Sequence, residues 1–367
     1  SAATTGVYNV AIGTSAADAL LTGACNIALG VGALGASQGA HNNIALGVDA
    51  MGAVVTGNTN IAIGYRTADA MTSGTVNIAI GQNAYGVAAA GSNNVAIGNT
   101  AMGGSLVTGT NNIAIGEAAA DALLGGACNI ALGKNSLGAA TVGVKNIALG
   151  LSAMGGVTTG QADNNIAIGI TAMQGGASTS GDYNIAFGHS SLQNVEAGGD
   201  NIAIGTNSAD AISSGACNIA LGINALGAAT TGVKNIAIGE LAMGTGNAII
   251  GGGACGCDNI AIGRSAASAL TQGVNNIAIG QAAADAISTG ATNVAIGLNA
   301  LGTATAHSCN NIAIGELAMG TGAGGSSAGQ GSFNVGIGKS ALSAATTGVY
   351  NVAIGTSAAD ALLTGAC

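Results

Sequence analysis

Residues 60–64 read Asn-Ile-Ala-Ile-Gly, and this short pattern decides the fold. In the form Asn, then Ile or Val, then Ala or Gly, then Ile, Leu or Phe, then Gly, it occurs twenty times in 367 residues, most often at steps of 17. A fixed period this short is the signature of a solenoid, in which each repeat forms one coil stacked on the last. The motif begins at Asn9, Asn26, Asn43, Asn60, Asn77, Asn94, Asn112, Asn129, Asn146, Asn165, Asn184, Asn201, Asn218, Asn235, Asn259, Asn276, Asn293, Asn311, Asn334 and Asn351.

The motif itself predicts a short strand followed by a turn. Its two aliphatic residues are two positions apart, so they share one face of a strand, and the small Ala between them faces the other way. The β-branched Ile favours strand over helix, and the final Gly permits a turn with positive φ. Seventeen residues at ~3.3 Å each make a coil of two or three short strands. We therefore predict an all-β parallel β-solenoid of about 20 coils, a single continuous body over residues 1–367.

A second apolar patch in each coil shows two ways of filling the interior. We number the motif Asn as slot one. In some coils slot nine is large and slot twelve is small, as in Leu137 with Ala140; in others the order is reversed, as in Ala120 with Leu123. Volume is exchanged between the two slots, as a close-packed interior requires. The second arrangement carries Ala-Asp-Ala and recurs in the first, fourth and seventh coils, which suggests a three-coil rhythm.

The sequence also contains a repeat that is much longer than one coil. Residues 343–367 repeat residues 1–25 letter for letter, at an offset of 342 residues. Packing alone does not explain this identity, because other coils differ at many slots. We expect residues 1–342 to be one tandem unit of a longer chain; the alternative is a fragment whose ends happen to match.

The Asn that opens every motif predicts a structural ladder. Stacked side-chain amides can donate and accept hydrogen bonds between successive coils. The alternative is a row of amides that faces a ligand. The ladder residues that we single out are Asn9, Asn26, Asn43, Asn60, Asn77, Asn94, Asn112, Asn129 and Asn146.

Composition excludes several classes of partner. Charged residues make up 6% of the chain, against about 25% in an ordinary soluble domain. There are 66 Gly, no Pro and no Trp, and the six basic residues are scattered in a chain of net charge −9, so we expect no nucleic-acid partner. An Asn and several Gly interrupt every coil, so no window holds the 18 or more apolar residues of a membrane span.

Two stretches carry a family resemblance. Residues 111–123 read NNIAIGEAAADAL and residues 93–104 read NNVAIGNTAMGG. They resemble the head repeats of trimeric autotransporter adhesins and the repeats of phage tail-fibre-like proteins. The resemblance implies a left-handed parallel β-roll, often trimeric, on an extracellular adhesive fibre. Head coils of that family are shorter than 17 residues, and a wider coil could enclose its own core as a single chain.

Cysteines offer the first candidate sites. Three of them directly precede a motif Asn and are five or six coils apart, which is over 20 Å at ~4.8 Å per coil and beyond the ~7 Å limit for a disulfide. They are either free or buried thiols, or they take part in inter-chain or loop disulfides. No spacing typical of a zinc site is present. The candidates for disulfides are Cys25, Cys128, Cys217, Cys255, Cys257 and Cys309.

The two longest coils offer the second candidates. They begin at Asn235 and Asn311, run for 24 and 23 residues, and both carry their extra residues after Glu-Leu-Ala-Met-Gly-Thr-Gly. Insertions project from a solenoid surface and often carry recognition. The alternative is a tolerated loop or a contact with a neighbouring fibre. The candidate contact residues are Gly246, Asn247, Ile249, Ile250, Gly324, Ser326 and Gln330.

Catalytic, cofactor and metal residues are not indicated, and we expect a protein that is not an enzyme. Gly30–Gly35 matches a dinucleotide-binding fingerprint, but a 17-residue coil has no room for the helix that such a site needs. The Asp residues of the Ala-Asp-Ala coils lie mostly three or more coils apart, ~14 Å or more, too far to share a calcium ion. They are Asp18, Asp69, Asp121, Asp210 and Asp285, and the three histidines, His41, His189 and His307, are equally dispersed.

These patterns predict a structural subunit of an extracellular filament whose main partner is itself, end to end and laterally. The first alternative is an adhesin or phage tail-fibre shaft whose inserted loops contact a glycan or a host surface. The second is an ice-binding solenoid, which needs a regular row of Thr; Thr22, Thr56 and Thr72 do not repeat from coil to coil.

Overall fold

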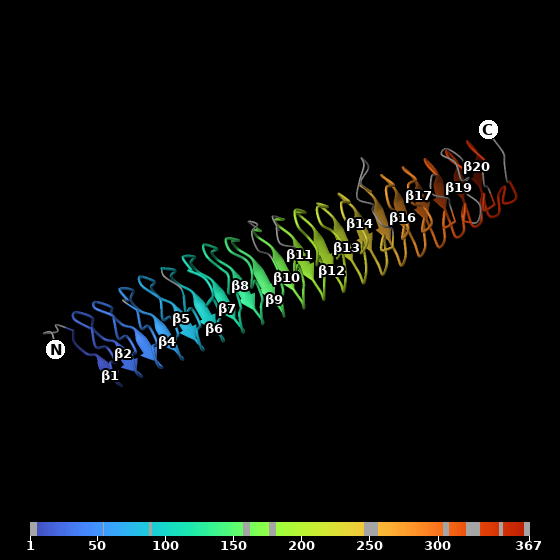
Figure 1. Cartoon of the computed structure of the whole chain (residues 1–367). Coiled ribbons are helices and arrows are strands. Elements are labelled where there is room, and N and C mark those ends of the chain that lie inside the picture. The colour runs from blue at the N-terminus through green and yellow to red at the C-terminus, as the bar shows by residue number, and fades with distance from the viewer. Residues whose placement is uncertain are drawn as a thin grey trace. The chain divides into compact units, whose positions relative to one another are not determined.

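The computed structural model describes residues 6–53, 55–87, 90–156, 162–175, 181–245, 256–303, 308–320, 331–344 and 348–362. The chain divides into two units, residues 1–182 and 183–367, which we describe separately. Within the described residues all regular structure is β-strand, one strand to each motif (Figure 1). The all-β parallel β-solenoid predicted from the repeat is therefore confirmed.

Unit 1 holds ten short strands among its described residues. Each strand pairs in parallel with the next one along the chain, without any slip: Ile113 faces Ile130, and Ala114 faces Ala131. The strands are β1 (Val10–Ile12), β2 (Ile27–Leu29), β3 (Ile44–Leu46), β4 (Ile61–Ile63), β5 (Ile78–Ile80), β6 (Val95–Ile97), β7 (Ile113–Ile115), β8 (Ile130–Leu132), β9 (Ile147–Leu149) and β10 (Ile166–Ile168).

Unit 2 is built in the same way. Its described residues also hold ten strands paired in parallel and in register, so that Ile236 faces Ile260 even though seven extra residues separate these coils. The strands are β11 (Ile185–Phe187), β12 (Ile202–Ile204), β13 (Ile219–Leu221), β14 (Ile236–Ile238), β15 (Ile260–Ile262), β16 (Ile277–Ile279), β17 (Val294–Ile296), β18 (Ile312–Ile314), β19 (Val335–Ile337) and β20 (Val352–Ile354).

Each coil contains one strand in its described residues rather than the two or three that its length suggests. The reason is the backbone, which enters the left-handed region at slots seven, nine and seventeen; in one coil these are Arg66 (φ 53°), Ala68 (φ 52°) and Val76 (φ 59°). This conformation costs an L-residue roughly 1–2 kcal/mol and interrupts an extended strand. Hydrogen bonds between coils offset the cost, as when Arg66 N–H donates to the Val48 carbonyl at 2.9 Å.

The Gly that closes the motif is required where it stands. Gly64 has φ +139°, and a Cβ placed on it would lie 2.7 Å from the carbonyl oxygen of Gly81 in the next coil. Both the conformation and the close approach of two backbones exclude a side chain. The Gly therefore sets the turn that sends the chain from the strand into the second apolar patch.

The core of each coil is narrow and filled by small residues from the strand and one large residue from the second patch. In β7 and β8 the central Ala114 and Ala131 are fully buried. Leu123 and Leu137, the large members of the two packing arrangements, are also fully buried. The large aliphatic residues of the strand point the other way, toward solvent: Ile115 is 39% exposed and Leu132 is 36% exposed.

The motif Asn closes its coil and joins it to the next. The side-chain Nδ2 of Asn112 donates to the carbonyl of Gly126 in the same coil at 2.9 Å. Its Oδ1 accepts hydrogen bonds from the backbone N–H and the Nδ2 of Asn129, at 3.0 and 3.1 Å. Asn112 is fully buried, and the same two kinds of contact recur along both units. Each amide thus satisfies polar groups that burial would otherwise leave unpaired.

Candidate interaction surface and polar notch

The first candidate surface is the outward side of the strands in each unit. We call it the strand face; it comprises the residues of slots two and four, the first and third residue of every strand. Its side chains are Ile, Leu, Val and one Phe, and Phe187 is 52% exposed. The largest contiguous apolar patch on an ordinary monomer is about 300–600 Å² and often functional. A row of large apolar residues along ten strands is therefore a candidate interaction surface.

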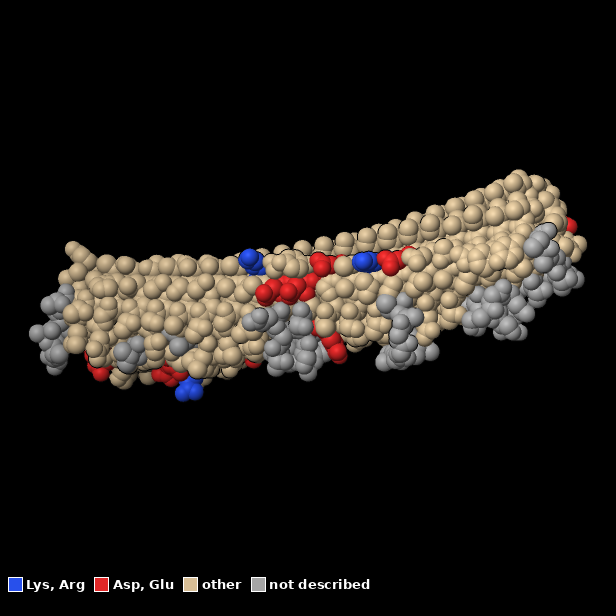
Figure 2. All heavy atoms as spheres, turned by 90° about the horizontal axis from the view of Figure 1, so that it is seen from above, with Lys and Arg blue, Asp and Glu red and all other residues tan. Residues whose placement is uncertain are grey.

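Two columns of exposed residues border the strand face. The slot-seventeen column precedes the motif Asn, and the slot-six column follows the motif Gly. Within the slot-six column Lys134 Nζ lies 3.0 Å from Glu117 Oε2, and Lys339 Nζ lies 3.0 Å from Glu316 Oε2. Both pairs join neighbouring coils and are about half exposed, so each contributes about 0–1 kcal/mol to stability. Charged side chains cover little of the face that Figure 2 shows.

The cysteines predicted as disulfide candidates fall into two groups. Cys25, Cys128 and Cys217 are free and exposed, and all three belong to the slot-seventeen column. Cys309 is half-buried, and its Sγ accepts a hydrogen bond from Ala291 N–H at 3.4 Å. Cys257 is buried and disulfide-bonded, while Cys255 lies outside the described residues.

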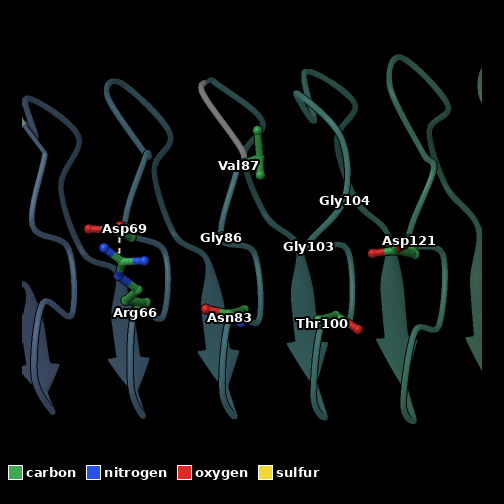
Figure 3. A pocket seen from close by; sticks show the side chains of 9 residues that line it. All are labelled: Arg66, Asp69, Asn83, Gly86, Val87, Thr100, Gly103, Gly104 and Asp121. Atoms are coloured by element: carbon green, nitrogen blue, oxygen red, sulfur yellow. Dashed lines mark ion pairs between the residues drawn. The ribbon is translucent and has the colours of Figure 1, made fainter.

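A second candidate is a polar notch at another corner of unit 1 (Figure 3). It is a cavity of about 380 Å³, bounded by Asp69 at one end and Asp121 at the other. Slot ten is Asp in the Ala-Asp-Ala coils and Gly in the two coils between them, here Gly86 and Gly103, so the three-coil rhythm hollows the surface. The remaining lining residues are Arg66, Asn83, Val87, Thr100 and Gly104.

A second notch has the same build. Its volume is about 330 Å³; Asp121 forms one wall, and Gly138 and Gly155 occupy slot ten in the two coils that follow. Asn135 and Ser152 take the places that Asn83 and Thr100 take in the first notch. The notch is therefore a repeating consequence of the coil rhythm. The sequence shows the rhythm, but not that the glycine coils leave a hollow.

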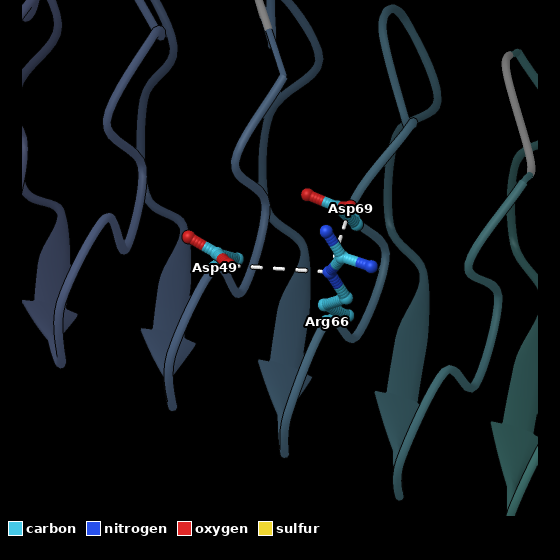
Figure 4. Close-up of polar contacts among 3 residues, drawn as sticks. All are labelled: Asp49, Arg66 and Asp69. Carbon is cyan, nitrogen blue, oxygen red and sulfur yellow. Dashed lines mark ion pairs between the residues drawn. The ribbon is translucent and has the colours of Figure 1, made fainter.

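The electrostatics of the first notch are weak and solvent-screened. Arg66 Nε lies 4.0 Å from Asp49 Oδ2 and 3.9 Å from Asp69 Oδ2, and all three side chains are more than a third exposed (Figure 4). Burial raises the pKa of the Asp69 carboxyl. The positive charge of Arg66 opposes this rise in pKa, and the negative charge of Asp49 adds to it. Burial also raises the pKa of Asp121, against the backbone N–H groups of Gly104 and Gly103. Carboxylate, amide and hydroxyl groups here can exchange hydrogen bonds with a polar ligand.

The other sequence-derived candidates are dispersed. His41 Nδ1 accepts a hydrogen bond from Ala24 N–H at 3.0 Å, a contact between neighbouring coils. His307 and all seven candidate contact residues of the two long coils lie outside the described residues. Among the described residues no three His, Cys, Asp or Glu side chains are grouped to hold a metal ion. The same residues include no helix of the length and apolarity that crossing a membrane requires.

Comparison with known proteins does not assign the chain to a family. No protein-family model and no curated protein sequence matches the chain. The β-solenoid that the family resemblance implies is present in the structure, while the autotransporter or tail-fibre family itself stays a prediction.

Proposed function

We propose that this chain is a structural subunit of an extracellular filament, in which copies associate laterally through the strand face and stack end to end. The observation that carries the proposal is the orientation of the motif. Its large apolar residues are partly or fully exposed in the strands of both units, while the small central residue, Ala or Gly, is buried in every strand except β1. The parts of these side chains that remain exposed contribute hydrophobic stabilisation only when a partner covers them.

The size of the strand face supports the proposal. A standard protein interface buries ~800 Å² on each partner. Unit 1 offers two outward side chains from each of ten strands, so twenty side chains reach that area when each loses about 40 Å². Partly exposed Ile and Leu side chains have this much to lose. One unit alone is therefore large enough for a stable lateral contact.

The composition supports the same proposal. The strand face carries no charged residue, and charged residues are only 6% of the chain. Burying it against another copy therefore costs no desolvation of ionised groups. The six Lys and Arg also leave few sites for trypsin-like proteases, an advantage outside the cell.

The test is to charge the strand face without touching the core. In unit 1 the double variant Ile115→Lys with Leu132→Lys places two ammonium groups on neighbouring strands. The control is Leu124→Lys, which is 40% exposed but belongs to slot thirteen, away from the strand face. We expect light scattering to show self-association of the wild type and of the control, and its loss in the double variant. Equal association in all three proteins contradicts the proposal.

The polar notches favour a second candidate function, recognition of a glycan on a host surface. Their carboxylate, amide and hydroxyl groups are those that hydrogen-bond sugar hydroxyls. Two sets of variants test it by binding to glycan-coated surfaces. One is Asp69→Ala with Asp121→Ala; the other is deletion of residues 246–252 and 321–326, which returns each long coil to the 17-residue period. Binding that is absent in the wild type, or unchanged in both variants, removes this candidate.

A further inference from the structure

We infer that, in unit 2, copies pack strand face to strand face in parallel and in register, with the slot-seventeen column of one copy against the slot-six column of the next. This inference rests on the proposed self-association. It adds the orientation and the axial register of the partner, which is a second copy of this chain.

The geometry follows from rotation. When copies are related by rotation about an axis parallel to the stacking direction, equivalent coils stay level and the start of a strand in one copy lies beside the end of that strand in the next. Slot seventeen then meets slot six. When a copy is reversed end for end, strand starts meet strand starts, so that slot seventeen meets slot seventeen of a different coil. The two orientations therefore bring different residues together.

Charges on two neighbouring coils fit the parallel orientation. β14 is bordered by Lys234 in slot seventeen and Glu240 in slot six, and β15 by Asp258 and Arg264. All four residues are exposed, and among the described residues none of them has an ion-pair partner within 4.0 Å. In the parallel orientation Lys234 meets Glu240 of the second copy, and Asp258 meets Arg264.

The other coils of unit 2 accept the same pairing. Residues six apart across each strand become neighbours between copies, and no two like charges meet. The pairs are Tyr183 with His189, Asp200 with Thr206, Cys217 with Ile223, Asn275 with Gln281, Thr292 with Leu298, Asn310 with Glu316, Phe333 with Lys339 and Tyr350 with Thr356. Complementary groups at the rim of an interface chiefly set register and partner choice, while the apolar strand face supplies affinity.

The reversed orientation also has a register that pairs the four charges, with Lys234 opposite Asp258 and Glu240 opposite Arg264. That register requires the rotation axis to pass between β14 and β15. β19 and β20 then have no counterpart within unit 2, so only eight of its ten strands pair with strands of the same unit. The parallel orientation instead covers all ten strands, and the larger buried apolar area favours it.

Cross-linking through a native cysteine distinguishes the two orientations. Cys217 is free and exposed, and in the parallel orientation it lies beside Ile223 of the second copy. In the reversed orientation it lies beside Asn275 instead. We therefore compare Ile223→Cys, Asn275→Cys and the control Leu298→Cys, all at exposed positions, with a short bis-maleimide. Covalent dimers are read on a denaturing gel.

The expected result is a new covalent dimer in Ile223→Cys and in neither of the other variants. A dimer in Asn275→Cys but not in Ile223→Cys overturns the inference in favour of the reversed orientation. Equal dimer yields in all three variants show that no orientation is fixed, and this also overturns it. If light scattering shows that none of the proteins self-associates, the proposed function itself has failed.

Charge reversal gives an independent test. In the parallel orientation Lys234→Glu meets Glu240 and should weaken association several-fold, and adding Glu240→Lys should restore it. In the reversed orientation the same double variant places Glu against Asp258 and Lys against Arg264, so association should weaken further. Sedimentation velocity at low salt, where exposed charges are least screened, separates restoration from further loss.

Discussion

At the residue scale, the Asn and the Gly of the motif have roles that the sequence makes predictable. An Asn in every coil predicts a hydrogen-bonded ladder, and Asn112 makes one hydrogen bond across its own coil and accepts two from the next. What the sequence does not show is the left-handed backbone at non-glycine residues such as Arg66, Ala68 and Val76. Local propensity opposes this conformation, and only the stacking of neighbouring coils imposes it.

Replacing one ladder Asn should destabilise the fold markedly. In Asn112→Ala the carbonyl of Gly126 and the backbone N–H of Asn129 lose their partners while they stay buried. An unsatisfied buried group costs about 1–3 kcal/mol, so we expect a loss of roughly 3 kcal/mol in the free energy of unfolding. Urea denaturation followed by circular dichroism measures it. The exposed Asn99→Ala is the control and should change stability by less than about 0.5 kcal/mol.

Relieving left-handed strain at one residue should stabilise the fold. Val76 is exposed and β-branched at φ 59°, where Asn is far better tolerated. We expect Val76→Asn to raise the free energy of unfolding by about 1 kcal/mol. The reciprocal Asn93→Val, at the same slot of the next coil with φ 58°, should lower it by a similar amount. Denaturation midpoints that move in the same direction for both variants would contradict this account.

At the scale of the element, the coil was predictable in its period and in its packing but not in its orientation. Residues two apart share a face, yet nothing in Asn-Ile-Ala-Leu-Gly says which face is inside. The structure turns Ile130 and Leu132 outward and buries Ala131, because the large residue of slot nine, here Leu137, already fills the narrow interior. The hydrophobicity of the motif alone would favour the opposite orientation. The strand face is thus a property of the folded coil.

Within one coil it should be possible to move the large buried side chain from slot twelve to slot nine without a large loss of stability. Leu123→Ala removes a fully buried side chain beside Ala120 and should cost about 3 kcal/mol. The adjacent Leu124→Ala, at a residue that is 40% exposed, is the matched control. Adding Ala120→Leu to Leu123→Ala recreates the arrangement of Leu137 with Ala140 and should recover most of the loss.

Thermal unfolding of the four proteins, including the wild type, measures this exchange. If the double variant is no more stable than Leu123→Ala alone, then the two arrangements are fixed by their neighbouring coils and are not interchangeable within one coil.

At the scale of the whole molecule, the three-coil rhythm places carboxyl groups at intervals along both units. Burial raises the pKa of Asp69 and Asp121 in unit 1 and of Asp210 and Asp285 in unit 2. The sequence predicted these positions, since Ala-Asp-Ala marks them. It did not predict their partial burial, because that depends on how the glycine coils beside them fold. Because the pKa of all four carboxyl groups is raised, the stability of both units should change with pH in the same direction.

We expect stability to rise on mild acidification. An Asp whose folded pKa lies above the unfolded value contributes most stability below its ordinary pKa of 3.8, and this contribution is lost as pH rises through the folded pKa. The free energy of unfolding should therefore increase between pH 7 and pH 4. Loss of the two exposed Glu–Lys pairs opposes this, but each is worth only about 0–1 kcal/mol. The decline of the net charge of −9 reinforces it.

The measurement is urea denaturation at constant ionic strength across that pH range. Asp69→Asn with Asp121→Asn should flatten the profile, since these variants remove two of the shifted groups but keep amide oxygens for the backbone donors. Asn83 lies in the same notch but does not titrate. Asn83→Ala should therefore change the free energy of unfolding by the same amount at every pH and leave its pH dependence unchanged. A wild type that loses stability steadily from pH 7 to pH 4 would show that other carboxylates, stabilised in their ionised form, dominate the response and that partial burial at slot ten does not govern it.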